Sequence, residues 1–133
     1  MKREDWQQRL KDYLRSIARR PFYIGRHDCA TFTAAAVEAM TGRDYMRGFR
    51  GYRTIKEGLR NAQAKGFADH IAVVAASFDE VSPSFAQMGD IAVVDGIGGD
   101  ALGIVQGANV YTIGATGLGI VPITAIKRAF RVG

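Results

Sequence analysis

The chain has 133 residues, the length of a single domain that can bury a hydrophobic core without disulfides or metals. Its composition, with 47% hydrophobic and 23% charged residues, is that of an ordinary globular protein and does not indicate intrinsic disorder. The lone cysteine, Cys29, excludes an internal disulfide and a cysteine-based zinc site, and neither a metal nor another cofactor is expected.

The net charge of +5 is unevenly distributed along the chain. Residues 1–66 carry 15 of the 18 lysines and arginines together with seven acidic residues, whereas residues 67–133 carry three basic and six acidic ones. This asymmetry predicts a basic face that meets an acidic partner, unless the exposed faces of the helices simply use arginine. Nucleic acid is not the expected partner, because no aromatic-rich RNA-binding motif accompanies the scattered basic residues.

The first half of the chain has the pattern of helices. An apolar stripe at helical spacing predicts a first helix over residues 3–20, ended by Pro21; its members are Trp6, Leu10, Tyr13, Leu14 and Ile17. A second, alanine-rich helix is expected to start at Asp28 or Cys29 and to end near Met40, with Asp28 as its N-cap and Gly42 as its stop signal. Its small side chains predict a central, buried helix.

Beyond the loop of residues 43–53, Thr54 and Glu57 have the spacing of a capping box and predict a third helix that ends at Gly66. The helical part after the first helix therefore spans residues 28–66. The apolar run at 71–76 is compatible with either a strand or a short buried helix, because its periodicity does not separate the two.

From Gly89 onward the pattern becomes that of strands. Short apolar runs at 91–94, 102–105, 110–113 and 118–121 are separated by turns that contain glycine, and residues 130–132 are expected to add a last strand. Residues 96–101 superficially match a dinucleotide-binding motif, but a strand follows the glycines where that motif needs a helix, so we expect a hairpin turn. The sequence predicts one α+β domain over residues 1–133, with N-terminal helices packed on a small antiparallel sheet or half-barrel over residues 89–132.

Cys29 is a candidate nucleophile, because the N–H groups and dipole at the start of a helix stabilise a thiolate and lower its pKa. The alternative is that it fills a small apolar space in a crowded helix. A cysteine nucleophile usually needs a histidine base, and the chain offers only His27 and His70. His27, two positions before Cys29, is the candidate base; the alternative is that it satisfies loop and helix-end backbone groups. His70 is expected to be a surface or capping residue.

Three segments resemble the NlpC-like cell-wall peptidases of the papain-like superfamily, and more narrowly a family of small proteins encoded in phage and prophage tail regions. They are Asp28-Cys29-Ala30-Thr31-Phe32, Gly89-Asp90-Ile91-Ala92-Val93-Val94 and Leu102-Gly103-Ile104-Val105. The resemblance implies a papain-like fold of NlpC type and places Cys29 at the nucleophile position. It places Ala101 at the position of the histidine base, and an alanine cannot accept a proton.

Two functions follow from this resemblance. The first is a structural or assembly protein of a phage tail tip, a pseudoenzyme on a degenerate cysteine peptidase fold. The alternative is an active tail-associated cysteine hydrolase of peptidoglycan peptides that uses Cys29. Other tail proteins are the expected partners in either case, and peptidoglycan is the additional partner of an active enzyme. Without a signal peptide or membrane span in the sequence, we expect synthesis in the host cytoplasm and location in the virion tail.

The loop of residues 43–53 alternates arginines with aromatic residues, a combination that favours protein interfaces. Rigid rings supply buried area, and guanidinium groups supply paired hydrogen bonds. The predicted partner interface consists of Arg43, Arg47, Phe49, Arg50, Tyr52 and Arg53. A solvated loop is the alternative.

Overall fold

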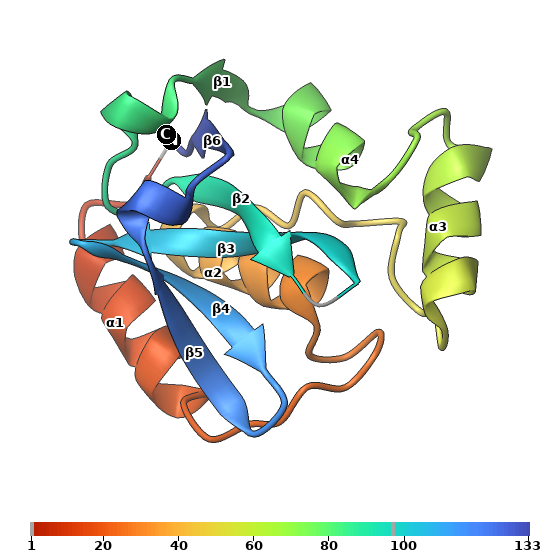
Figure 1. Cartoon of the computed structure of the whole chain (residues 1–133), viewed down its shortest axis with the longest axis horizontal. Coiled ribbons are helices and arrows are strands. Elements are labelled where there is room, and N and C mark those ends of the chain that lie inside the picture. The colour runs from red at the N-terminus through yellow and green to blue at the C-terminus, as the bar shows by residue number, and fades with distance from the viewer. Residues whose placement is uncertain (1, 97) are drawn as a thin grey trace.

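The computed structural model describes residues 2–96 and 98–133, which form four α-helices and six β-strands (Figure 1). The helices are α1 (Trp6–Ser16), α2 (Cys29–Thr41), α3 (Ile55–Ala64) and α4 (His70–Ser77). The strands are β1 (Asp79–Val81), β2 (Ile91–Gly96), β3 (Gly99–Gln106), β4 (Asn109–Gly114), β5 (Gly117–Pro122) and β6 (Arg128–Arg131). The four α-helices precede the strands, and two short 3-10 helices, Pro83–Phe85 and Ile123–Ala125, lie among the strands. This arrangement confirms the α+β class.

Several predicted boundaries need correction. The helix expected over residues 3–20 spans only Trp6–Ser16, because the chain turns after Ile17 and the carbonyl of Ala18 accepts a hydrogen bond from Leu118 of β5 instead. The ambiguous run at 71–76 is helical: it lies in α4, whose N-cap Asp69 accepts a hydrogen bond from the backbone N–H of Ala72. The sheet starts at β1, ten residues before the expected start at residue 89.

The sheet is antiparallel throughout, with the strand order β1-β6-β2-β3-β4-β5. The last strand, β6, is inserted between β1 and β2, while β2 to β5 follow one another as a meander (Figure 1). In the central pairs, Ile91 lies opposite Ile104 on one side and opposite Phe130 on the other. The cross-strand neighbours at the centre of the sheet, Ile91, Ile104 and Phe130, are therefore far apart in the sequence.

The two faces of the sheet bury different clusters. Helix α2 passes behind β3 in Figure 1 and packs on one face, where buried residues of α1, α2 and α4 meet alternate residues of the strands. The strand residues on this helix-covered face include Ile91, Val93, Leu102, Ile104 and Phe130. The intervening residues form a second cluster on the opposite face, which includes Ala92, Val94, Val105, Val110 and Ala129. This alternation decides which residues can approach α2.

Helix α3 lies at the outer end of the molecule, beside α4 and away from the sheet (Figure 1). Ala62 is its one buried residue, and Ile55 on its outer side is 74% exposed. The ring of Tyr52 packs against Gly58, where an added Cβ would lie 3.1 Å from the ring. Tyr52 therefore connects this outlying helix to the rest of the domain.

Candidate functional site around Cys29

A capping box fixes the start of α2. The Asp28 carboxylate accepts a hydrogen bond from the backbone N–H of Thr31 at 2.8 Å, and the Thr31 hydroxyl accepts one from the N–H of Asp28 at 2.8 Å. Asp28 has extended backbone, so the helix begins at Cys29 and places it in the first turn. This confirms the predicted N-cap, and Gly42 in the left-handed conformation ends the helix as expected.

The second carboxylate oxygen of Asp28 organises the surroundings of the helix start. It accepts hydrogen bonds from the backbone N–H of Gly25 at 2.9 Å and from the Tyr52 hydroxyl at 2.5 Å. Burial and this bond to Asp28 raise the pKa of Tyr52, which keeps its hydroxyl protonated as a donor. Because Asp28 is buried and its two oxygens serve the backbone and Tyr52, it serves structure and does not orient an imidazole.

The Cys29 thiol is half-buried and packs against the cluster between the helices and the sheet. Burial raises its pKa, and the neighbouring backbone N–H groups of Leu102 and Ala30, which act in the opposite direction, do not offset this effect. The negative charge of Asp28 raises the pKa further. The expectation that the pKa of Cys29 is lowered is therefore wrong: desolvation outweighs the backbone N–H groups that would lower it.

His27 is close to Cys29 in sequence but is engaged elsewhere. It is 1% exposed, its ring packs edge-on against Phe32 with centroids 6.3 Å apart, and its backbone pairs with Tyr23. Burial and the positive charge of Arg20 lower the pKa of the imidazole, so it is neutral at physiological pH. Its Nε2 atom has no hydrogen-bond partner within residues 2–96 and 98–133.

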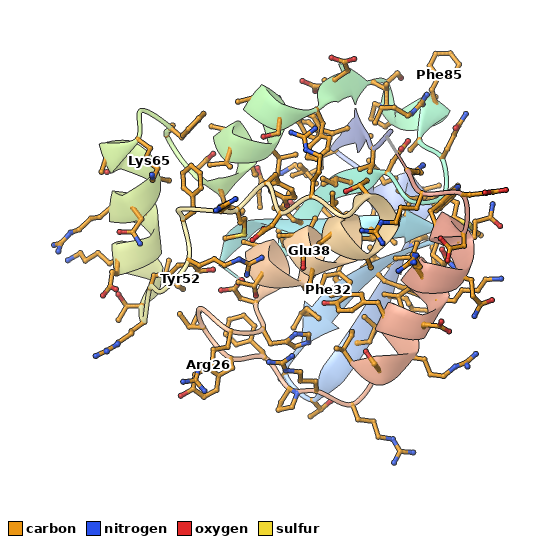
Figure 2. All side chains as sticks on the ribbon, turned by 180° about the vertical axis from the view of Figure 1, so that it is seen from behind. Arg26, Phe32, Glu38, Tyr52, Lys65 and Phe85 are labelled. Carbon is orange, nitrogen blue, oxygen red and sulfur yellow. The ribbon has the colours of Figure 1, made fainter. Side chains whose placement is uncertain are left out.

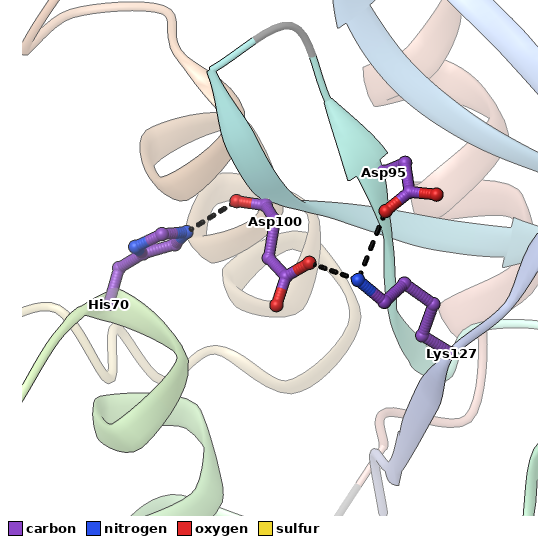
Figure 3. A network of polar contacts seen from close by, with 4 residues as sticks. All are labelled: His70, Asp95, Asp100 and Lys127. Atoms are coloured by element: carbon purple, nitrogen blue, oxygen red, sulfur yellow. Dashed lines mark hydrogen bonds and ion pairs between the residues drawn. The ribbon is translucent and has the colours of Figure 1, made fainter.

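The other histidine, His70, lies at the start of α4 and faces the β2–β3 hairpin. Its Nε2 atom lies 3.2 Å from the backbone oxygen of Asp100 (Figure 3). In the same network, Lys127 of the segment before β6 pairs with Asp100 at 2.5 Å and with Asp95 at 3.0 Å. These exposed ion pairs contribute little stability but align the hairpin. Among the described residues, neither imidazole is hydrogen-bonded to Cys29.

Ala101, the position that the resemblance assigns to the base, lies on the wrong face of the sheet for that role. It packs against the cluster opposite the helices, across from Val94 on β2. The next residue, Leu102, belongs to the cluster against which Cys29 packs. An aliphatic side chain therefore occupies the helix-covered face at this point of β3, and it cannot accept a proton.

Two buried hydroxyl groups in this part of the domain were not predicted. Thr33 lies one helical turn after Cys29, and Tyr45 lies close enough that a thiolate there would raise its pKa. Both oxygens are buried without a hydrogen-bond partner in the described part of the chain. Burial also raises the pKa of Tyr45, so its hydroxyl is not a base. The spacing of Thr33 on the helix could have been read from the sequence, but the position of Tyr45 depends on how the loop folds back.

Asp90, in the second segment of the resemblance, has a structural role. It is fully buried immediately before β2 and accepts hydrogen bonds from the backbone N–H groups of Gln87 and Val132 at 2.9 and 3.2 Å. Arg131 completes the set with an ion pair at 3.1 Å. The carboxylate thus ties the turn before β2 to the end of β6, which explains an aspartate at this position without any catalytic function.

The predicted interface loop is partly engaged within its own chain. Arg50 makes a two-bond ion pair with Asp44, with both N–O distances at 3.0 Å. The ring of Phe49 packs edge-on against Phe67 with centroids 5.7 Å apart, and Tyr52 binds Asp28 as described above. The other predicted interface residues, Arg43, Arg47 and Arg53, are exposed. The loop is thus held to the rest of the chain by its own contacts, and only Arg43, Arg47 and Arg53 remain for a partner.

Within the described residues there is no group of three or more histidine, cysteine or acidic side chains that could hold a metal ion. None of the helices in that part of the chain is long and apolar enough to cross a membrane. The reactive or polar groups of this region are the protonated thiol of Cys29, the buried hydroxyl groups of Thr33 and Tyr45, and the Asp28 carboxylate, which caps α2.

A comparison with curated proteins finds no match. A family model described as a domain of unknown function, DUF6950, matches residues 1–132, almost the whole chain. The protein therefore belongs to the DUF6950 family.

Proposed function

We propose that this protein is a structural or assembly protein of a phage or prophage tail tip, built on an NlpC-like cysteine peptidase fold that no longer catalyses. The observation that carries the proposal is the isolation of Cys29: its thiol has a raised pKa, and no imidazole in the described residues is hydrogen-bonded to it. The NlpC-like part of the proposal is supported by a cysteine in the first turn of a helix that packs on an antiparallel sheet.

Acyl transfer by cysteine requires a thiolate, a base that is within reach of it, and donors for the oxyanion. A free thiol is already only a few per cent ionised at pH 7, and a raised pKa reduces that fraction further. His27 and His70 are held by other contacts, and Ala101 and Leu102 offer no proton acceptor on either face of β3. A fold with these side chains can hold partners but lacks the means to activate a nucleophile.

The alternative, an active hydrolase of peptidoglycan peptides, is favoured by one observation. Cys29 is not fully buried, and the backbone N–H groups of Leu102 and Ala30 are close enough to act on it. Such donors at a helix start are the kind that stabilise a developing negative charge. This candidate requires a base that the structure does not provide.

Two measurements on matched proteins test the proposal. Purified wild type and Cys29→Ala are incubated with purified peptidoglycan, and released peptide fragments are quantified by mass spectrometry; we expect no difference between them. Tail particles assembled with either protein are then analysed for composition, and we expect equal incorporation. Fragment release by the wild type that is absent from Cys29→Ala would establish the hydrolase. Absence of the wild-type protein from particles would refute the assembly role.

A further inference from the structure

A basic groove runs along the outer side of α2. Two adjoining cavities of about 510 and 530 Å³ share Glu38 and Gly42 in their linings. The first is completed by the chain after α2, with Arg43, Asp44 and Arg47, and the second by α1 and the residues before it, with Arg3, Arg9, Tyr13, Ala35 and Ala39. In Figure 2, which views the helical side, Glu38 stands on α2 in front of the sheet. We call this surface the α2 groove.

Most of the positive charge in the α2 groove is uncommitted. Arg3, Arg43 and Arg47 are exposed and make no ion pair with any described residue, whereas Arg9 pairs with Asp5 at 2.8 Å. The carboxylate of Asp44 is already neutralised by its two-bond pair with Arg50, which lies outside the lining.

Glu38 is the exception in this charge pattern. It is exposed and lines both cavities, and no described residue forms an ion pair with it. Its negative charge does contribute to raising the pKa of Arg50 nearby. Among the described residues, the α2 groove thus presents three arginines outside any ion pair around one carboxylate that is also outside any ion pair.

The floor of the α2 groove is made of small residues. Ala35, Ala39 and Gly42 follow one another at intervals of four and three residues, so they lie along one side of the helix. At the end of this row the guanidinium group of Arg3 occupies the space beside Gly42, where an added Cβ would lie 2.4 Å from Nη2. A second helix can approach closely over Ala35 and Ala39, and at the Gly42 end of the row it meets the Arg3 guanidinium group.

We infer that the α2 groove binds an acidic helical segment of a neighbouring tail protein. This inference follows from charge complementarity. The arginines outside ion pairs attract carboxylates, and Glu38, which lines both cavities, attracts one basic residue in an otherwise acidic segment. A uniformly anionic polymer such as nucleic acid would place phosphates against Glu38 and suffers repulsion there. The inference rests on the proposed assembly function, because the occupant is a protein of the same particle.

The first experiment identifies what occupies the groove. The full chain carrying the photo-crosslinking residue p-benzoylphenylalanine in place of Ala39 is produced together with the complete set of tail proteins, and cross-linked peptides are sequenced by mass spectrometry. We expect cross-links to one segment of a tail protein that has net negative charge. Cross-links confined to neutral or basic segments, or none above those of a chain that carries the probe in place of exposed Ile55 on α3, would overturn the inference.

The second experiment tests the charges against a matched control. Arg43→Glu combined with Arg47→Glu should lower incorporation into particles about tenfold or more, since like charges then face each other in the groove. Lys56→Glu combined with Arg60→Glu makes the same change of charge on exposed α3 residues and should leave incorporation within about twofold. Circular dichroism checks that both variants fold.

Equal incorporation of the wild type and the Arg43→Glu, Arg47→Glu variant would refute only the inference that the α2 groove binds the partner. Absence of the wild type from particles would refute the assembly function and, with it, the inferred partner. Nucleic acid is tested with a labelled single-stranded oligonucleotide by fluorescence anisotropy. Binding that Glu38→Lys strengthens and that Arg43→Glu with Arg47→Glu abolishes would assign the groove to nucleic acid and refute the inference. We expect Glu38→Lys to lower incorporation, because the basic residue of the partner then meets a positive charge.

Discussion

The Asp28 carboxylate is predicted to be the polar group on which the region around Cys29 most depends. Replacing it with alanine removes the acceptor for the backbone N–H groups of Thr31 and Gly25 and for the Tyr52 hydroxyl. All three donors come from different elements: the first turn of α2, the turn before it and the loop that leads to α3. Asp28→Ala should therefore weaken the connections among these elements, with little direct effect on the sheet.

The expected loss of unfolding free energy follows from the individual bonds. Removing an N-cap costs about 1 kcal/mol. Each of the other two bonds to a charged acceptor contributes about 1.5 to 3 kcal/mol, part of which is recovered because a charge no longer has to be buried. We expect Asp28→Ala to lose about 3 kcal/mol, a large share of the roughly 5 to 15 kcal/mol typical of a domain. Tyr52→Phe, which removes one bond, should lose about 1.5 kcal/mol.

Urea denaturation followed by circular dichroism measures these losses in a double-mutant cycle. In the Asp28→Ala background, Tyr52→Phe should cost close to nothing, which corresponds to a coupling of about 1.5 kcal/mol. Asp28→Asn should lie between wild type and alanine, because its amide oxygen still caps Thr31 while its NH₂ group meets the N–H of Gly25. A loss below about 1 kcal/mol for Asp28→Ala, or losses that simply add in the double variant, would refute the reasoning.

Three further predictions concern neighbouring residues. Because the pKa of the thiol is raised, a thiol reagent should label native Cys29 slowly at neutral pH, with a labelling rate that rises about tenfold per pH unit and increases on denaturation. Mass spectrometry measures the labelling rate. Rapid labelling that depends on His27 would contradict the raised pKa. Burial lowers the pKa of His27, so the folded protein is most stable, with respect to this group, above the unfolded pKa of about 6.5, and it loses stability as the pH falls from there through the lower folded pKa. Urea titrations at about pH 7 and pH 5 should therefore show a smaller decrease in the free energy of unfolding for His27→Gln than for the wild type. Equal decreases would argue against a buried neutral imidazole. Gly25→Ala should lower the free energy of unfolding by more than about 3 kcal/mol and Gly51→Ala by only about 1 kcal/mol. Both glycines have left-handed backbone, but only at Gly25 would the new Cβ collide with the Tyr52 carbonyl oxygen. Thermal unfolding measures both variants, and similar losses would show that this collision does not matter.

Features with a local cause could be predicted from the sequence. The start and end of α2 depend on the short-range chemistry of Asp28 and Gly42, and both predictions were confirmed. The hairpin between β2 and β3 likewise follows from a cluster of glycines between two apolar runs. The end of α1 has a distant cause and was missed, because Ala18 bonds to β5. The run at 71–76 was left open between strand and helix, and its burial of Ile71 and Val74 in the core, together with the Asp69 cap, makes it a helix.

The chemical properties of the candidate site could not be predicted in the same way. The helix start at Cys29 favours a thiolate, but the loop and β3 that cover it determine how far it is desolvated, and desolvation prevails. Phe49 and Arg50 have the pattern of an interface, yet Phe67 and Asp44 already satisfy them within the chain. For Cys29 and Phe49 the deciding neighbours come from other elements. For Arg50 the neighbour is Asp44 of the same loop, and the sequence pattern does not show that these two side chains pair with each other.

The insertion of β6 between β1 and β2 has a consequence for synthesis on the ribosome. Translation is vectorial, so β2 emerges and pairs with β3 on one side while its other side waits for residues 128–131. At about 5 to 20 residues per second, the stretch from the end of β2 to the end of β6 takes roughly 2 to 7 seconds. During that interval the nascent chain carries an apolar strand with one unpaired edge. A second copy emerging from the next ribosome on the same message carries the same open edge, so polysomes are where this topology is most exposed to strand exchange.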